Sequence, residues 1–195
     1  MGKIKSALEI ALERTESVKS NKSSIDQFAA KQKGKKLAND FIEGNIKSLD
    51  DEIKKEPKDD RASLVQGIYD VLISRIALPA GKEELAQVEA AGRGLNVVLG
   101  AKRFGETVKQ LGQLLNQYLD ETAQYEEAIK KQYAPKLKQK EEEIAKRLGR
   151  AVKLDPFQDQ EFVTFYNQHI NALKANYQSV IDQVKEEAAN LFEDK

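Results

Sequence analysis

In the second half of the chain, residues on one predicted helix face recur at alternating steps of four and three positions. This spacing keeps one side of an α-helix against a partner. The residues are Phe104, Val108, Leu111, Leu115, Tyr118, Thr122, Tyr125 and Ile129. The pattern predicts a helix from Phe104 to Leu148, about 65 to 70 Å long. Pro135 lies inside it and removes one backbone hydrogen bond, so we expect a kink there and not a break.

A second long helix is predicted to return along the first. Residues 149–155 form the turn, with Asp155 as the helix N-cap and Pro156 at the first helical position. One stripe of the return arm carries Phe162, Tyr166, His169, Leu173, Tyr177, Val180, Val184 and Leu191. The arm is long enough to reach back to Leu111, which predicts an antiparallel hairpin. Its other flank must be covered by the first half of the chain or by a second copy.

The first half reads as several shorter helices. A helix over residues 2–18 places Ile4, Leu8, Ala11, Thr15 and Val18 on one face. The polar residues 17–22 are expected to end it. Ser24 and Gln27 then form a capping-box pattern for a second helix. This helix is expected to bury Ile25, Phe28, Leu37, Phe41 and Ile42.

Glycine and proline divide the rest of this half. Gly44 predicts a left-handed stop, a short helix follows over residues 46–53, and Pro57 marks a turn. Residues 64–78 are the most apolar segment and predict the central helix of a bundle. A further helix leads to Gly100. We therefore expect an all-α protein in which a long antiparallel, coiled-coil-like helical hairpin, residues 101–195, packs with a smaller N-terminal helical bundle, residues 1–100.

Composition narrows the function classes. The 195 residues include 32 basic and 32 acidic residues, so no global field attracts nucleic acid or an anionic membrane. Charged residues make up 33 % and aromatic residues 7 %, which is typical of long solvated helices with narrow apolar seams. The absence of cysteine excludes disulfides and sulfur-ligated metal sites. No apolar stretch is long enough for a membrane span, so we expect a cytoplasmic protein.

Two glycine patterns bear on nucleotide binding. Residues 100–107 approach the phosphate-binding pattern G-x-x-x-x-G-K-[ST], but Glu106 stands where the lysine must neutralise phosphate. We interpret this segment as a joint between two helices. Gly92, Gly94 and Gly100 lack the spacing of a dinucleotide fingerprint, and we expect them to loosen a linker.

Catalytic and metal-binding groups are few. His169 is the only histidine, and its place on the apolar stripe favours a half-buried ring bonded across the hairpin. Glu141, Glu142 and Glu143 are successive residues that point in different directions on a helix, so we expect a solvated face. We predict no catalytic residue, no metal and no cofactor.

Two patterns concern membranes. Lys31, Lys33, Lys35 and Lys36 form the densest basic run and are the candidate contact for an anion or a lipid headgroup, although a solvated helix face is the preferred interpretation. Met1, Gly2 and Ser6 satisfy the short form of an N-myristoylation signal, but the same residues open an amphipathic helix, which we prefer.

Three segments carry a resemblance to a known family. They are KIKSALEIALERT (residues 3–15), YAPKL (133–137) and LDPF (154–157). The chain resembles an uncharacterised family of all-helical bacterial proteins found among spirochaetes and related groups. The resemblance spans most of the chain and implies a bacterial cytosolic protein with no assigned activity, so it supplies no site residues. It also argues against myristoylation.

These observations predict a non-enzymatic helical protein for interaction or assembly, similar to an adaptor or a stalk. Its hairpin would bind a protein partner or a second copy of the chain, and nucleic acid is not favoured. One alternative is a peripheral binder of anionic lipid or of a membrane surface. A second alternative is an enzyme or ligand binder with a pocket between bundle and hairpin. The sequence leaves open whether the hairpin tip is a contact point.

Overall fold

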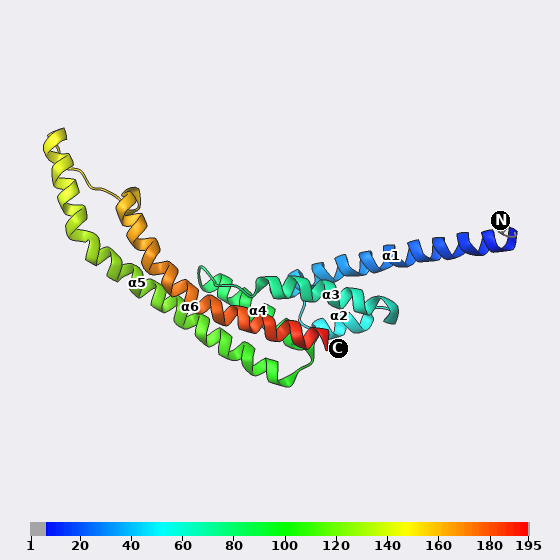
Figure 1. Cartoon of the computed structure of the whole chain (residues 1–195). Coiled ribbons are helices and arrows are strands. Elements are labelled where there is room, and N and C mark those ends of the chain that lie inside the picture. Colours follow the sequence, from blue (N-terminus) through cyan, green and yellow to red (C-terminus); the bar gives the residue numbers. More distant parts are fainter. Residues whose placement is uncertain (1–6, 195) are drawn as a thin grey trace, which may run out of the picture.

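The structure, a computed structural model, describes the backbone of residues 7–194 and the side chains of residues 24–194. Six α-helices and one short 3-10 helix make up this part of the chain, which contains no strand. The helices are α1 (Ala7–Ile42), α2 (Leu49–Lys55), α3 (Lys58–Arg75), α4 (Lys82–Leu99), α5 (Lys102–Leu148) and α6 (Gln160–Glu193), and the 3-10 helix η1 is Pro156–Gln158. The predicted all-α class, with a long hairpin beside an N-terminal bundle, is confirmed (Figure 1).

The long hairpin consists of α5 and α6. Helix α5 continues through Pro135, and Figure 1 shows it bending in its distal half. At about 1.5 Å per residue, α5 is about 70 Å long. Its C-terminus is closed by Gly149, which adopts the left-handed conformation with φ 66°. Helix α6 then runs back along α5 and brings the C-terminus to the bundle (Figure 1).

The return arm begins slightly later than predicted. Asp155 does act as an N-cap, because its side chain accepts a hydrogen bond from Phe157 N–H, but the helix that it caps is η1. The cap of α6 is Asp159, whose carboxylate accepts a hydrogen bond from Glu161 N–H.

The phase of the hairpin seam differs from the prediction at several positions. Tyr125 is 47 % exposed, and Glu126 lies nearer the seam. On α6, Ile170 and Ile181 are buried where His169 and Val180 were predicted. The buried stripe is Phe162, Ile170, Leu173, Tyr177, Ile181, Val184 and Ala188, with half-buried Tyr166 between the first two. These steps of four, four and three repeat every 11 residues, a period close to that of a straight α-helix.

Helices α1 and α3 approach each other unusually closely. A Cβ atom at Gly34 would lie 2.1 Å from the carbonyl oxygen of Leu64, and one at Gly67 would lie 2.1 Å from that of Lys31. Ala30 and Ala38, one turn before and one turn after Gly34, are also buried. Small residues at these positions let the two backbones pack almost directly against each other.

The predicted break in the first helix is wrong. Helix α1 is continuous from Ala7 to Ile42, so the polar residues 17–22 do not end it and Ser24 lies inside it. Ile25 and Phe28 were predicted to be buried, but they are 66 % and 65 % exposed. Leu37, Phe41 and Ile42 do pack against the core. The predicted apolar face of residues 2–18 and the myristoylation pattern concern side chains outside the described residues.

The later elements of the bundle lie close to their predictions, with shifted ends. The short helix predicted over residues 46–53 is α2, Leu49–Lys55, and the helix predicted over residues 64–78 is α3, which begins earlier and ends at Arg75. Gly44 ends α1 in the left-handed conformation with φ 80°, and Ser48 caps α2 by accepting a hydrogen bond from Asp51 N–H. Helix α3 buries Leu64, Ile68 and Leu72 and is the central helix of the bundle.

The glycines of α4 have a different role from the predicted one. Gly92 and Gly94 lie buried inside the helix and do not form a linker. A Cβ atom at Gly92 would lie 2.5 Å from a methyl group of Val108 on α5. One at Gly94 would lie 2.8 Å from a methyl group of Leu72 on α3. Both glycines therefore let neighbouring helices pack closely against α4.

One main core joins the bundle to the proximal part of the hairpin. It includes residues of α3 such as Ile68, residues of α4 such as Leu95, and Phe104, Ile181 and Ala188 of the hairpin. At its edge, the rings of Tyr69 and Phe192 stack with centroids 4.0 Å apart. The distal part of the hairpin has small clusters of its own, built from Ile129, Tyr133, Phe162 and Ile170 and from Tyr118, Leu173 and Tyr177.

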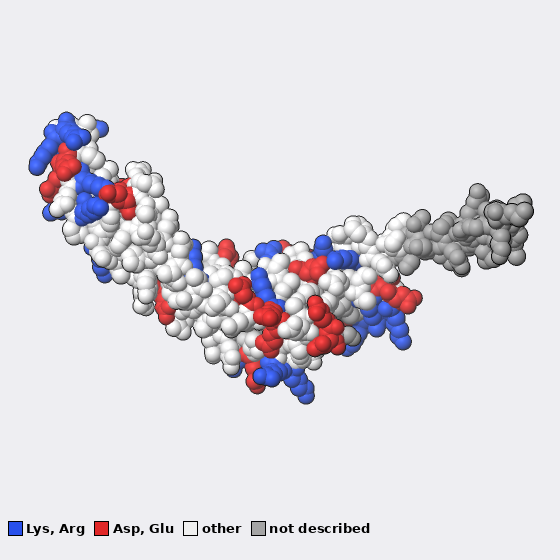
Figure 2. Space-filling view, viewed as in Figure 1, with Lys and Arg blue, Asp and Glu red and all other residues white. Residues whose placement is uncertain are grey.

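The molecule is elongated. In Figure 1 the distal half of the hairpin extends from one end of the bundle, and the N-terminal half of α1 extends from the other. Figure 2 shows acidic and basic side chains mixed over most of the visible face, while Lys and Arg gather at the far end of the hairpin.

Candidate interaction site at the hairpin tip

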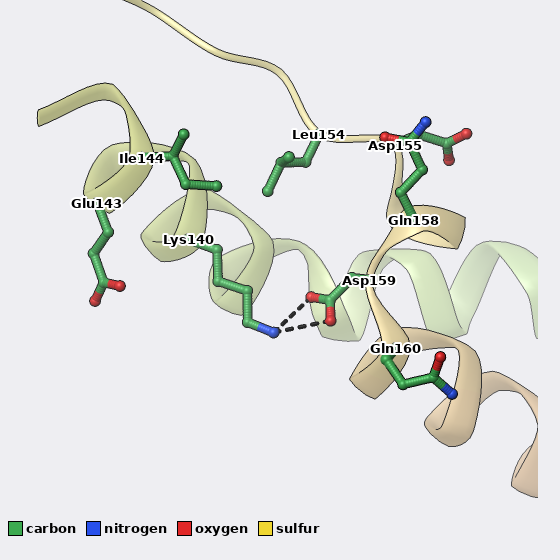
Figure 3. A pocket seen from close by; sticks show the side chains of 8 residues that line it. All are labelled: Lys140, Glu143, Ile144, Leu154, Asp155, Gln158, Asp159 and Gln160. Carbon is green, nitrogen blue, oxygen red and sulfur yellow. Dashed lines mark hydrogen bonds and ion pairs between the residues drawn. The ribbon is translucent and has the colours of Figure 1, made fainter. Parts of the chain in front are cut away.

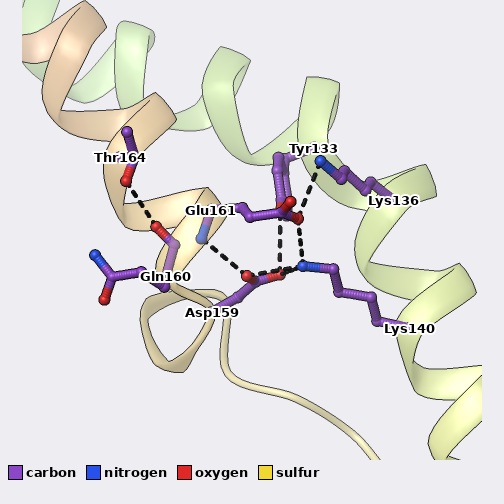
Figure 4. A network of polar contacts seen from close by, with 7 residues as sticks. All are labelled: Tyr133, Lys136, Lys140, Asp159, Gln160, Glu161 and Thr164. Atoms are coloured by element: carbon purple, nitrogen blue, oxygen red, sulfur yellow. Dashed lines mark hydrogen bonds and ion pairs between the residues drawn. The ribbon is translucent and has the colours of Figure 1, made fainter.

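A network of five polar side chains joins the two arms of the hairpin beside its tip. Tyr133, Lys136 and Lys140 come from α5, and Asp159 and Glu161 come from the start of α6 (Figure 4). We call these five residues the tip network. Lys140 Nζ lies 2.7 Å from Asp159 Oδ2 and 2.5 Å from Glu161 Oε2. Lys136 Nζ lies 3.0 Å from the same Glu161 oxygen, and Tyr133 donates a hydrogen bond of 3.0 Å to Asp159.

Helix geometry brings these side chains together. Lys136 and Lys140 follow Tyr133 by three and seven residues, so all three lie on one face of α5. Asp159 is held from the other side because it caps α6, and its side chain is only 9 % exposed. A carboxylate that caps a helix also faces the positive end of the helix dipole.

The loop between the arms is fixed by a separate contact. The backbone N–H of Leu154 donates a hydrogen bond of 2.8 Å to Glu141 Oε1 on α5. Phe157 in η1 packs edge-on against Phe162 and Tyr166, with ring centroids 5.2 Å apart in both pairs. The loop is therefore braced against both helices.

The network shifts the proton affinity of its members. Hydrogen bonds from Lys140 and Tyr133 hold the pKa of Asp159 below its usual value, although desolvation works in the opposite direction. Hydrogen bonds from Lys140 and Lys136 likewise lower the pKa of Glu161. The pKa of Lys140 is raised by its hydrogen bonds to both carboxylates. All three groups therefore keep their charges over the neutral pH range.

A shallow pocket of about 330 Å³ lies beside the network, between the end of α5 and the loop (Figure 3). Its walls combine the apolar Ile144 and Leu154 with the carboxylates of Glu143, Asp155 and Asp159. In Figure 3 the ammonium group of Lys140, which lines the pocket, points at Asp159, so this lysine is already paired with a carboxylate.

Farther down the hairpin, two tyrosines of α6 bond to carboxylates of α5. Tyr166 donates a hydrogen bond of 2.5 Å to Glu126, and Tyr177 donates one of 2.8 Å to Glu121. Desolvation, together with the neighbouring carboxylate, raises the pKa of each phenol to about 12. Both phenols stay neutral donors at physiological pH and help to set the register of the arms.

The predicted basic run lies on α1, and its members face different directions. Lys31 forms an ion pair of 2.8 Å with Asp70 of α3, and Lys33 forms one of 2.5 Å with Glu56. Burial raises the pKa of Asp70, but hydrogen bonds from Lys31 and Gln66 outweigh this effect and lower it, with a further contribution from Lys35. Lys36 is exposed. The use of this run as an anion or lipid contact stays a prediction.

His169 does not occupy the predicted half-buried position. It is exposed, and its ring lies edge-on to that of Phe165 with centroids 4.5 Å apart. The prediction failed because Ile170, and not His169, faces α5.

The glycine segment at residues 100–107 is a joint between helices, as predicted. The residues before it belong to α4 and not to a strand, and Gly100 closes that helix with φ 64°. The phosphate-binding pattern therefore lacks its strand–loop–helix context.

The three successive glutamates diverge on α5. Glu141 accepts the hydrogen bond from the loop, and Glu142 and Glu143 are exposed. The part of the chain that the structure describes contains no cluster of three or more metal-ligating residues. No helix in that part is both long and apolar enough to cross a membrane.

Sequence reasoning missed the tip network. One available signal was the face shared by Tyr133, Lys136 and Lys140. Another was Asp159, which stands two residues before Glu161 at a helix start. Neither signal identifies its partner on the other arm until the register of the hairpin is known.

Comparisons with known proteins identify a family and no function. A family model described as "Family of unknown function (DUF6657)" matches residues 50–190, a range that contains almost all of α2 to α6 and excludes α1. No curated protein matches the chain. No solved structure matches it either. Because the model covers well over half of the chain, this protein belongs to the family of unknown function DUF6657.

Proposed function

We propose that the chain is a non-enzymatic assembly protein that pairs with a second copy through α1 and uses the hairpin as an arm. The arm would hold a second contact surface away from the bundle. The single observation that carries the proposal is the exposure of Ile25 and Phe28, at 66 % and 65 %, on a helix that extends beyond the rest of the bundle. Large apolar side chains so exposed are typical of contact surfaces when they lie together.

The two residues lie on the free side of α1. At 100° per residue, Ile25 and Phe28 point roughly opposite to Ala30, Gly34 and Ala38, the side that packs on α3. A second copy presents the same apolar pair, so the surface is self-complementary under two-fold symmetry.

The hairpin supports the second part of the proposal, in which it holds a contact surface away from the bundle. Its distal half extends away from the bundle at the end opposite to the N-terminal half of α1 (Figure 1). Its own apolar clusters and the tip network keep the two arms together there. A bacterial cytoplasmic setting is also part of the proposal, and it rests on the sequence resemblance.

Light scattering of the purified chain at several concentrations tests the self-association. We expect a dimer that dissociates on dilution. The double variant Ile25→Ser, Phe28→Ser should be a monomer throughout. Tyr125→Ser is the matched control, because Tyr125 is also a large exposed side chain, and it should leave the dimer intact. A wild-type chain that is monomeric at every concentration would contradict the proposal.

A second candidate function is small-ligand binding between bundle and hairpin. A pocket of about 310 Å³ lies where the loop between α3 and α4 meets the hairpin. Pro79 and Ala80 line one side, and Tyr118, Thr122 and Tyr166 line the other. The Thr122 hydroxyl oxygen is buried without a hydrogen-bond partner in the described part of the chain. A ligand that raises the melting temperature of the wild type but not of Thr122→Val would support this function. A broad screen with no such ligand would count against it.

A further inference from the structure

The apex of the hairpin carries four cations and no acid. We define the apex as residues 146–153, the end of α5 and the first part of the loop. Its cations are Lys146, Arg147, Arg150 and Lys153, and all four are exposed. The nearest acidic residues along the chain are Glu143 on one side and Asp155 on the other. In Figure 2 this end of the molecule shows a dense group of basic side chains, with acidic side chains of the neighbouring residues beside them.

These four cations differ from the lysines just below them. Lys136 and Lys140 are paired with the carboxylates of the tip network. None of the four apex cations forms an ion pair with any residue in the described part of the chain. None of them is therefore held by a close ion pair that an outside partner would have to break.

Apolar residues stand among the apex cations. Leu148 is 57 % exposed at the last position of α5, and Ala151 is exposed in the loop. The left-handed Gly149 turns the chain between them. A leucine at such a protruding end is unpartnered in the described structure, and transferring it out of water would be favourable.

We propose that the apex docks on the surface of an anionic phospholipid bilayer. Lys and Arg are attracted to the negative surface potential of such a bilayer, and a neighbouring leucine can enter the interface beneath the headgroups. A site for single-stranded nucleic acid would favour aromatic side chains that stack on bases, and residues 146–153 contain none. An acidic protein segment would use the cations but would gain less from Leu148.

The position of the apex suits a flat partner. The apex is the protruding end of the hairpin and lies away from the bundle in Figure 1, so a surface can approach it without meeting α1 to α4. The inference rests on the proposed function only in using the hairpin as an arm. Self-association through α1 is measured separately by light scattering. A chain that dimerises without binding vesicles can therefore be distinguished from one that binds vesicles without dimerising.

Sedimentation with vesicles tests the inference on the full chain. The vesicles contain phosphatidylcholine with phosphatidylserine, or phosphatidylcholine alone, at low and at high salt. The apex variant changes Lys146, Arg147, Arg150 and Lys153 to Gln, and the control variant changes the exposed Lys102, Arg103, Lys109 and Lys174 to Gln. Both have the same net charge, and circular dichroism verifies their folds. Their partition coefficients are compared with those of the wild type and of Leu148→Ser.

Each cation near an anionic surface contributes about a fivefold gain in partitioning, so we expect the apex variant to lose roughly several hundredfold. The control variant should lose much less. Leu148→Ser should lower binding to the vesicles by about tenfold. It should leave binding to soluble poly-glutamate unchanged, because that polymer offers charge without an apolar interior.

Three results would overturn the inference. The first is a wild type that does not sediment with phosphatidylserine vesicles at low salt. The second is an equal loss of binding in the apex and control variants, which would assign the effect to net charge alone. The third is tighter binding to poly-glutamate or RNA than to the vesicles, together with unchanged vesicle binding in Leu148→Ser. That result would identify a soluble polyanion as the partner of the apex.

Discussion

The ammonium group of Lys140 lies 2.7 Å from Asp159 Oδ2, and this pair joins the two arms of the hairpin just below the apex. Asp159 caps α6 at the same time, so one carboxylate links the start of the return helix to the outgoing helix. The pair thereby fixes where the second arm begins.

Replacing Lys140 with Met should loosen the hairpin tip and leave the bundle unchanged. The substitution leaves Asp159 and Glu161 next to each other without their shared cation, and the two like charges repel. Hydrogen exchange should show faster exchange at Leu154 and over the first turn of α6, with no change in α3 and α4. Lys131→Met is the control, because Lys131 forms only an exposed pair of 3.5 Å with Glu127. Unchanged exchange at the tip would mean that the network does not brace it.

Gly34→Ala should destabilise the protein as a whole. The new Cβ atom would lie 2.1 Å from the carbonyl oxygen of Leu64, so the backbones of α1 and α3 must move apart. We expect a loss of about 1–3 kcal/mol in the free energy of unfolding, measured by chemical denaturation. Gly81→Ala is the control, since its Cβ atom would meet nothing within 4 Å and its φ is not positive. Equal stabilities of the two variants would refute the close packing of α1 on α3.

The hairpin should lose stability between about pH 10 and pH 12. The pKa values of Tyr166 and Tyr177 are raised to about 12 in the folded state, above about 10 for a free tyrosine. A raised pKa favours the protonated form in the fold, so this contribution is complete below about pH 10 and is lost as the pH rises toward about 12. Absorbance titration of the phenolates should show a late step to which Tyr166 and Tyr177 contribute, beside Tyr69 and Tyr133, whose pKa values are also raised. The Tyr166→Phe, Tyr177→Phe variant should show a smaller late step, and a wild type whose 6 tyrosines all titrate near the ordinary value would disagree with the structure.

Phe192→Ala should weaken the link between the end of α6 and the bundle. The Phe192 ring stacks on Tyr69 of α3 at 4.0 Å between centroids and is half-buried at the edge of the main core. We expect a loss of roughly 1–2 kcal/mol in the free energy of unfolding, still in a single cooperative transition. If the hairpin of the wild type unfolded at a lower denaturant concentration than the bundle, the two parts would not share one core.

The sequence predicted the hairpin well because its two arms are long and their apolar positions are periodic. The prediction named the wrong buried residues where the spacing changed. A strict alternation of four and three places Tyr125 and His169 on the buried face, whereas the observed stripe of α6 steps by four, four and three. An error of one residue turns a side chain by about 100° and is enough to expose it.

Three other features could not be predicted from the local sequence. The polar residues 17–22 suggested a loop, but the backbone of α1 continues through them, and no Gly or Pro interrupts the helix there. The close approach at Gly34 and Gly67, and the contact between Lys140 and Asp159, each depend on two segments meeting. The residues are visible in the sequence, but the pairing is not.

The measurement that tests the account most directly is the distance between the bundle and the apex in solution. The chain has no cysteine, so Ala86→Cys on α4 and Ala151→Cys at the apex give a unique pair of exposed sites for spin labels. In the monomeric Ile25→Ser, Phe28→Ser background, electron–electron double resonance should give one narrow distance distribution, which Lys140→Met should broaden. A broad or multimodal distribution in that monomeric background, with Lys140 intact, would contradict a braced arm that holds the apex away from the bundle.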